Sequence, residues 1–251
     1  MLKKIIRRLP NIIQGPINYI YGNIPSEYKY GAVYRETYKF IKESETWSYN
    51  KLLEHQYLQL GRLLTYVYEN CLYYKKIFDK ISLNPLKLKD IDDIQKIPLL
   101  TKDIIRNNLE DIQSKAFNDK QIIFETTGGS SGNPFKFCSQ KGFSRSREVA
   151  FIADLWDRIG YIFGKDVRMV LRGTIPNSAD GIEYRPASKE LICSTYYTDE
   201  THLYNYYKKM KDFNIQFIHG HVSSIAILAQ FMVNNRLYYR LRAETCPCIN
   251  C

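Results

Sequence analysis

Glu125-Thr126-Thr127-Gly128-Gly129-Ser130-Ser131-Gly132-Asn133-Pro134 is the most informative stretch of this sequence. It combines three glycines with four hydroxyl side chains, and it lies between the apolar run 122–124 and the alternating run 135–137. This order predicts a strand, a tight glycine loop and a second strand. Because glycine has no Cβ and accepts positive φ, successive backbone N–H groups of such a loop can point at one anion.

The hydroxyl groups of this stretch suit the same ligand. They can donate to phosphate oxygens or ligate a magnesium ion, and a hydrogen bond to a charged group contributes about 1.5–3 kcal/mol. A Walker A loop is excluded, because that motif needs Gly-Lys-Ser/Thr at the start of a helix, whereas Asn133-Pro134 follow Gly132 here. The structural alternative is a flexible Ser/Gly hairpin loop, but glycines at these spacings between two apolar runs favour an anion-binding loop.

The order Thr127–Pro134 resembles the phosphate-binding signature of adenylate-forming enzymes, Thr-Ser/Gly-Gly-Ser/Thr-Ser/Thr-Gly-x-Pro. The variable position is often lysine in that family and is Asn133 here. Upstream, Trp47-Ser48, Tyr73-Tyr74 and the run Ile97–Lys102 resemble the N-terminal region of phenylacetate-CoA ligase-like proteins. That branch includes adenylate-forming proteins encoded with capsular polysaccharide genes, and the resemblance covers about residues 45–235.

The resemblance implies a ligase that uses ATP and Mg²⁺ to activate a small-molecule carboxylate as acyl-AMP, and that passes the acyl group to a thiol such as coenzyme A. It also implies a set of residues that hold the β- and γ-phosphates: Thr127, Gly128, Gly129, Ser130, Ser131 and Gly132. The family's aromatic-Gly-x-Thr-Glu element and its C-terminal catalytic lysine have no counterpart in this sequence. We therefore expect a truncated ligase, inactive alone, and we assign no catalytic residue.

The expected fold is α/β, with an N-terminal helical region followed by part of the mixed-sheet large domain of an adenylate-forming enzyme, and with the C-terminal domain absent. We divide the chain into a mostly helical region at 1–110, an α/β part at 111–237 and a divergent cysteine-containing tail at 238–251. A sheet cut short would expose an edge and apolar surface, which predicts self-association or a complementing chain.

Local patterns predict the individual elements. Helices are expected at 34–41, 49–69 capped by Ser48, 73–78, 88–94, 102–108 capped by Thr101, 139–159, 198–211 and 224–234 capped by Ser223. Strands are expected at 122–124, 135–137, 167–171, 190–193 and 215–218. The rest of 16–44 and the segment 175–185 are expected to be irregular.

A second candidate site follows the strand at 215–218. A strand, a glycine turn and a capped helix form the unit by which doubly wound sheets present a ligand at one edge. His219, Gly220 and His221 are therefore candidates for binding the acyl substrate, and the alternative is that they only form a turn. In the family, a Gly-Tyr-Pro-Ser-Ser-like element occurs here, and Gly220–Ser224 resembles a variant of it. We predict no metal site, because two histidines at i and i+2 need a third ligand.

For each of the other candidate side chains, a purely structural role is the alternative to a functional one. Arg172 ends a predicted strand, where it could contact a ligand or simply lie at the surface. His55 and Gln56 fit a flank of a core helix better than a site. Cys71, Cys138 and Cys193 are dispersed, as in a reduced protein. Cysteines also end the tail but make a poor zinc site without a second cluster: Cys246, Cys248 and Cys251.

Composition limits the function classes. The net charge is +10, but lysine and arginine are scattered and no recognition motif appears, so we expect no nucleic-acid partner. The alternatives to a ligase are a nucleotide- or phosphate-binding module that needs a partner chain and a basic nucleic-acid-binding protein. No apolar run could span a bilayer, and the start of the chain lacks a signal-peptide core, so we expect a cytoplasmic protein without a transmembrane segment. Apolar residues at helical spacing within 2–9 could pack on their own domain or on an acidic membrane surface.

Overall fold

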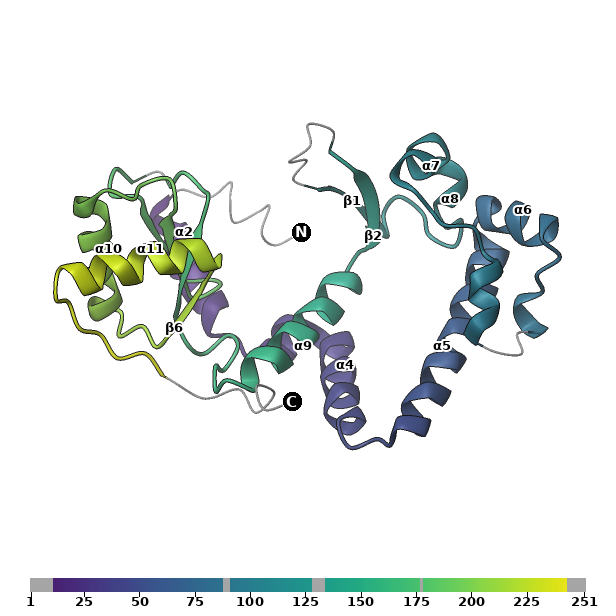
Figure 1. Ribbon diagram of the computed structural model, residues 1–251, viewed down its shortest axis with the longest axis horizontal. Coiled ribbons are helices and arrows are strands. Elements are labelled where there is room, and N and C mark those ends of the chain that lie inside the picture. The colour runs from purple at the N-terminus through teal and green to yellow at the C-terminus, as the bar shows by residue number, and fades with distance from the viewer. Residues whose placement is uncertain (1–10, 88–90, 128–133, 177, 243–251) are drawn as a thin grey trace. The chain divides into compact units, whose positions relative to one another are not determined.

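The computed structural model describes residues 11–87, 91–127, 134–176 and 178–242, and it contains helices and a mixed sheet (Figure 1). The predicted fold class, α/β with an N-terminal helical region and a mixed sheet, is confirmed. The chain forms two compact units. One joins the residues through Arg35 to those from Val149 onward, and the other comprises Glu36–Glu148.

The continuous unit, Glu36–Glu148, is mainly helical. After most of α4 (Gly31–Ser44), its elements are α5 (Tyr49–Asn70), α6 (Leu72–Lys80), η1 (Pro85–Lys87), η2 (Ile91–Lys96), α7 (Lys102–Asn107), α8 (Leu109–Ile112), β1 (Ile122–Thr126), β2 (Lys136–Gln140) and the first residues of α9 (Ser144–Asp157). The two predicted caps are confirmed, because Ser48 accepts a hydrogen bond from the Lys51 N–H and Thr101 accepts one from the Ile104 N–H.

His55 belongs to the packing of this helical unit. Its ring lies 4.9 Å from that of Phe40 and 5.3 Å from that of Trp47. The Trp47 and Phe40 rings meet edge to face at 5.6 Å. Such aromatic contacts stabilise a helix pair beyond simple burial. The structural reading of His55 is therefore the correct one.

The discontinuous unit is built on a four-stranded sheet with the order β4-β5-β3-β6. Its strands are β3 (Arg168–Arg172), β4 (Ile182–Arg185), β5 (Glu190–Ser194) and β6 (Phe217–Gly220). β3 is parallel to both β5 and β6, whereas β4 runs antiparallel to β5. The parallel strands therefore end at the same edge of the sheet, and we call it the carboxyl edge.

One face of this sheet packs against α10 (Glu200–Asp212) and α11 (Val222–Asn234) (Figure 1). Alternate strand residues point into this core together with apolar side chains of both helices: Met169, Leu171, Leu191, Cys193, Leu203, Tyr206, Met210 and Leu228. The intervening strand residues face the other way. They form the opposite face, which carries Arg168, Arg172, Glu183, Arg185 and Glu190, and we call it the polar face.

The segment 16–44 was expected to be mostly irregular, and that expectation is wrong. Helices α2 (Asn11–Asn23), α3 (Ser26–Lys29) and α4 fill it. Contacts with distant residues stabilise these helices: a Cβ on Gly22 would lie 2.1 Å from the Pro186 carbonyl oxygen, and Ser26 Oγ donates to the Phe163 carbonyl at 3.3 Å. Tertiary packing has overridden weak local periodicity.

Several boundaries also differ from the expected ones. β4 lies within the segment 175–185, which was expected to be a loop. Helix α9 begins at Ser144 rather than 139, because β2 continues to Gln140. Helix α10 begins after Asp199, whose carboxylate accepts from the His202 N–H at 3.2 Å. Helix α11 begins after His221, so the predicted cap at Ser223 is wrong.

Some expectations lie outside the described residues: the helical spacing at 2–9, the first residues of the helix at 88–94, and the cysteines of the tail. Within 91–96 the backbone forms the 3₁₀ helix η2 instead of an α-helix. Across the parts of the chain that the structure describes, the helices are all too short or too polar to cross a bilayer.

Candidate functional site

The glycine stretch is carried by the β1–β2 hairpin, as the sequence predicts. The two strands pair antiparallel, from Ile122 opposite Gln140 to Thr126 opposite Lys136. At the base of the loop, the Thr127 N–H donates to the Phe135 carbonyl at 2.9 Å, and the Phe135 N–H donates to Thr127 Oγ1 at 3.0 Å. The predicted phosphate contacts beyond Thr127 lie outside the described residues: Gly128, Gly129, Ser130, Ser131 and Gly132.

The hydroxyl of Thr127 can make a second hydrogen bond after closing the loop. Its oxygen accepts one hydrogen bond, and its own proton is still available to donate. Below it, Ser139 Oγ donates to Glu125 Oε2 at 2.8 Å across the hairpin, and the Lys136 ammonium lies 4.5 Å from the centre of the Phe124 ring. The stem therefore fixes both ends of the loop, which suits a loop whose backbone must keep one geometry around an anion.

The second candidate, His219-Gly220-His221, lies at the carboxyl edge, where β6 passes into α11. Gly220 pairs with Leu171 on β3, and a Cβ on Gly220 would lie 2.9 Å from Leu171 Cβ and 3.1 Å from the Leu171 carbonyl oxygen. Only glycine allows β6 and β3 to approach this closely without a shift of the backbone. His221 forms the N-cap of α11 without a side-chain hydrogen bond to it.

His219 is on the polar face of β6. Its ring meets the ring of Trp156 at 5.5 Å in an edge-on contact, and the residue as a whole is exposed. Partial burial lowers the pKa of His219, and the positive charges of Arg168 and Arg172 lower it further. The ring is therefore neutral near neutral pH, and each ring nitrogen can act as a hydrogen-bond donor or acceptor according to the tautomer.

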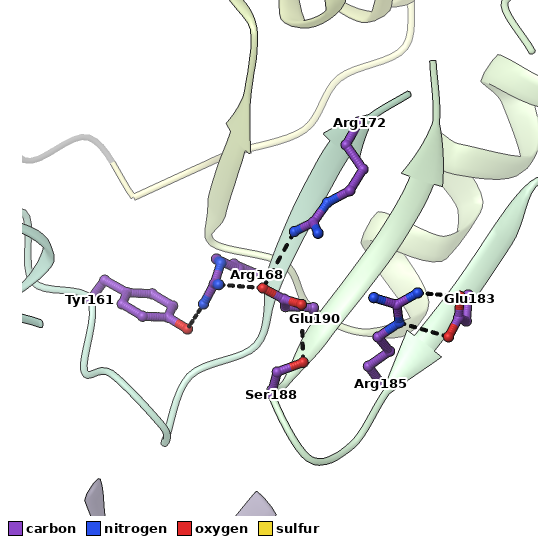
Figure 2. Close-up of polar contacts among 7 residues, drawn as sticks. All are labelled: Tyr161, Arg168, Arg172, Glu183, Arg185, Ser188 and Glu190. Atoms are coloured by element: carbon purple, nitrogen blue, oxygen red, sulfur yellow. Dashed lines mark hydrogen bonds and ion pairs between the residues drawn. The ribbon is translucent and has the colours of Figure 1, made fainter. Parts of the chain in front are cut away.

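A charged network crosses the polar face at the other end of the strands (Figure 2). Arg168 Nη2 donates to Glu190 Oε1 at 2.5 Å, and Arg168 Nη1 donates to Tyr161 Oη at 2.8 Å. The guanidinium also lies 4.1 Å from the centre of the Trp156 ring, and Ser188 Oγ donates to Glu190 Oε2 at 3.0 Å. The side chains of Arg168 and Glu190 are only 10% and 11% exposed, so this ion pair is buried.

Sequence reasoning missed Arg168 and Glu190. The available signal was a charged residue at the start of an otherwise apolar strand in both 168–171 and 190–193. A charge at such a position is rarely buried unless it is paired. The sequence does not reveal the partner, because 22 residues separate the two.

Arg172, at the carboxyl end of β3, is turned back along the polar face toward Glu190, and its Nη2 lies 3.6 Å from Glu190 Oε1 (Figure 2). Arg185 makes a bidentate pair with Glu183, with distances of 2.7 Å and 2.9 Å. This pairing lowers the pKa of Glu183. Of these arginines, Arg172 makes the longest ionic contact with its carboxylate.

Two other features of the described residues carry no site. A cavity of about 30 Å³ at the carboxyl edge, between α10 and α11, is lined by Ser194, Thr198 and Ser224 among others, and this volume suits a water molecule but is too small for an acyl substrate. Burial raises the pKa of the Cys193 thiol to about 12, which excludes it as a nucleophile. Among the described residues, His, Cys, Asp and Glu form no group that could hold a metal ion.

Comparisons with known proteins bear on the fold and on the resemblance found in the sequence. No family model matches the chain. Protein CapK of Staphylococcus aureus is 27% identical over 241 residues, which cover 94% of this chain and 52% of CapK. A structure of 2-hydroxyisobutyryl-CoA ligase in an open conformation, in complex with 2-HIB-AMP and CoA, superposes with a TM-score of 0.53 at 13% identity, covering 76% of this chain and 45% of that one.

The chain is similar to CapK and has the fold of the 2-hydroxyisobutyryl-CoA ligase structures. The same ligase in its thioesterification state, again with 2-HIB-AMP and CoA, superposes with a TM-score of 0.51 at 16% identity, over 76% of this chain and 42% of that chain. This chain therefore spans about half the length of the proteins it matches, and it corresponds to the N-terminal part of CapK. These similarities agree with the resemblance to adenylate-forming ligases found in the sequence, and they show the fold.

Proposed function

We propose that this chain is the N-terminal part of an ATP-dependent, phenylacetate-CoA ligase-like enzyme. The reaction activates a small-molecule carboxylate as acyl-AMP, and a thiol such as coenzyme A accepts the acyl group. The observation that carries the proposal is the β1–β2 hairpin: hydrogen bonds between Thr127 and Phe135 close the glycine loop at its base, in a chain with the fold of acyl-CoA ligases.

In this proposal the glycine loop holds the β- and γ-phosphates of ATP. Its backbone N–H groups and the hydroxyls of Thr127, Ser130 and Ser131 donate to the phosphate oxygens, which keeps the leaving pyrophosphate in line and spreads its developing charge. The described residues fit this task at the loop base, where the Thr127 proton is available to donate. Mg²⁺ would be held by loop hydroxyls and by the phosphates themselves, as is usual for this ion.

The proposed acyl-substrate site lies at the carboxyl edge, lined by His219, Gly220 and His221. Support comes from the position of these residues at the end of a parallel strand, where open α/β sheets bind ligands. The similarity to CapK supports a role in capsular polysaccharide biosynthesis. Because the proposed reaction consumes ATP and coenzyme A, the proposed location is the cytoplasm.

Thermal unfolding with increasing concentrations of ATP and Mg²⁺ tests the proposal on this chain. A ligand at a hundred times its Kd stabilises the native state by about 2.7 kcal/mol, so the melting temperature should rise with ATP concentration. The rise should disappear in the double variant Gly129→Ala/Ser131→Ala. The matched control is Ser139→Ala, which removes a hydroxyl from the hairpin stem and should keep the ATP response. An unchanged melting temperature in folded wild-type chain contradicts the proposal.

A nucleotide-binding module that works with a partner chain is the second candidate, and the closed base of the glycine loop supports it equally. The two candidates differ in what the chain does alone. Carboxylate-dependent exchange of pyrophosphate into ATP by this chain alone would support a complete adenylation site. Exchange that appears only after addition of the C-terminal half of CapK would support the module.

A further inference from the structure

The charges on the polar face do not balance. Among the described residues of β3, β4 and β5, this face carries three arginines, Arg168, Arg172 and Arg185, and two carboxylates, Glu183 and Glu190. A face with one more cation than anions can accept an anionic ligand without leaving a charge unpaired. An anionic ligand would bind the guanidinium group whose contacts with protein carboxylates are the weakest.

The contacts single out Arg172. Arg168 is buried against Glu190, Tyr161 and Trp156, and Arg185 makes two short hydrogen bonds to Glu183. Arg172 approaches Glu190 Oε1 at 3.6 Å, and that oxygen already accepts from Arg168. An ionic contact at this distance, from a side chain that is 39% exposed, contributes little and breaks at little cost.

Hydrogen bonds hold the backbone of Arg172 at the carboxyl edge. Its carbonyl oxygen accepts from the Thr174 N–H at 2.9 Å and from the Thr195 N–H at 3.0 Å, so the side chain starts from a fixed point at the carboxyl edge. Arg172 lies two residues after Val170 on the same face of β3, and Val170 pairs with His219 on β6. The electrostatic effect of Arg172 on His219 agrees with this proximity.

We infer that Arg172 binds the carboxylate of an organic acid at the carboxyl edge, beside His219. This inference rests on the proposed function, because it makes Arg172 the residue that recognises the acyl substrate. The planar guanidinium matches a carboxylate with two parallel hydrogen bonds. Val170 and Ile192 in the adjacent row are buried, so the surface beside Arg172 is the exposed ring of His219. This aromatic ring suits the hydrocarbon part of an acid better than it suits free phosphate.

Ligand binding would draw Arg172 away from Glu190. The Glu190 carboxylate would then keep the hydrogen bonds from Arg168 and from Ser188, so its charge would stay compensated. The buried network thus supports the polar face while Arg172 exchanges one carboxylate partner for another.

Arginine footprinting with phenylglyoxal, followed by peptide mass spectrometry, tests this inference on the complete chain. Arg172 and Arg185 are almost equally exposed, at 39% and 42% of their side chains, so Arg185 is an internal control. Benzoate at ten times its Kd should slow modification of Arg172 about tenfold and leave Arg185 unchanged. The neutral isostere benzamide should protect neither. If benzoate and acetate, each raised to its solubility limit, leave Arg172 as reactive as before, the inference is overturned.

Variants provide the second arm. Stabilisation by benzoate in thermal unfolding should be lost in Arg172→Gln, weakened in Arg172→Lys because the paired donors are gone, and kept in Arg185→Gln. Protection of Arg172 by pyrophosphate but not by benzoate would show a phosphate site instead and would overturn the carboxylate assignment. Neither arm contains ATP. If benzoate does not protect Arg172 but ATP still raises the melting temperature, only this inference is contradicted. If benzoate protects Arg172 but ATP does not raise the melting temperature, only the assignment of the glycine loop is contradicted.

Discussion

Replacing Glu190 by glutamine removes the counter-charge of a guanidinium that is almost completely buried. Arg168 would keep its hydrogen bond to Tyr161 and its contact with the Trp156 ring, but its positive charge would be uncompensated in a medium of low polarity. Breaking a buried ion pair by removing one partner costs about 3–5 kcal/mol. Because the amide still offers an oxygen to Arg168, we expect a loss near the lower limit, about 3 kcal/mol.

The assay follows from the positions of the two tryptophans. Trp47 lies in the unit Glu36–Glu148, whereas Trp156 contacts Arg168 in the discontinuous unit. In a Trp47→Phe background, fluorescence during urea unfolding reports on the surroundings of Arg168. The free energy of unfolding should fall by about 3 kcal/mol with an unchanged slope, and the melting temperature should fall by about 6–12 °C for a chain of this size.

Glu183→Gln is the matched control for that experiment. It removes a carboxylate from the same polar face, but this carboxylate and Arg185 are 39% and 42% exposed, so the expected cost is at most about 1 kcal/mol. Equal and small costs for the two variants would refute the reasoning, because they would mean that water screens the Arg168–Glu190 pair as well as it screens an exposed pair.

Two further predictions concern single residues. Gly220→Ala should destabilise the chain by about 1–3 kcal/mol in urea unfolding, because its Cβ would overlap Leu171. Gly61→Ala, in α5 with no atom within 4 Å of the added Cβ, should instead stabilise it by about 1 kcal/mol, and an equal gain in both variants would contradict the close approach of β6 to β3. The folded chain lowers the pKa of His219, so the unfolded chain binds this proton more readily, and the stability from this group, present above about pH 6.5, is lost as pH falls through the lowered pKa. His219→Asn should therefore show a shallower loss of stability between neutral pH and about pH 5, and equal slopes in the two proteins would contradict the lowered pKa.

Features encoded by neighbouring residues were predictable from the sequence. Ser48 and Thr101 cap the helices that their spacing indicates, because an N-cap needs only a hydroxyl and the next three residues. The strand, loop and strand around Thr127 are likewise read from glycines between two apolar runs. The surroundings of His219 and Gly220 were predictable only in part, because a strand was expected at 215–218 with a turn after it, whereas β6 spans Phe217–Gly220 and includes both residues.

Features that depend on distant residues were not predictable. Helix α2 lacks a clear local period, and it is stabilised where Gly22 meets Pro186. Strand β4 alternates Glu183 and Arg185 with core residues, and as a short edge strand it is recognisable only from its pairing with β5. The ion pair of Arg168 and Glu190 depends on the parallel register of β3 and β5, and this register cannot be predicted from either strand's sequence alone.

The discontinuity of the unit that carries the sheet has a consequence for synthesis on the ribosome. Helices α2 and α3 leave the exit tunnel first, yet their partners Pro186 and Phe163 are translated only after the whole of Glu36–Glu148. Chains fold progressively from the N-terminus as they are made. The unit Glu36–Glu148 can therefore become compact while α2 and α3 still lack their partners. Once Glu36–Glu148 is compact, the effective length of chain between α2–α3 and the sheet is shorter. The entropic cost of packing these helices on their partners is then lower.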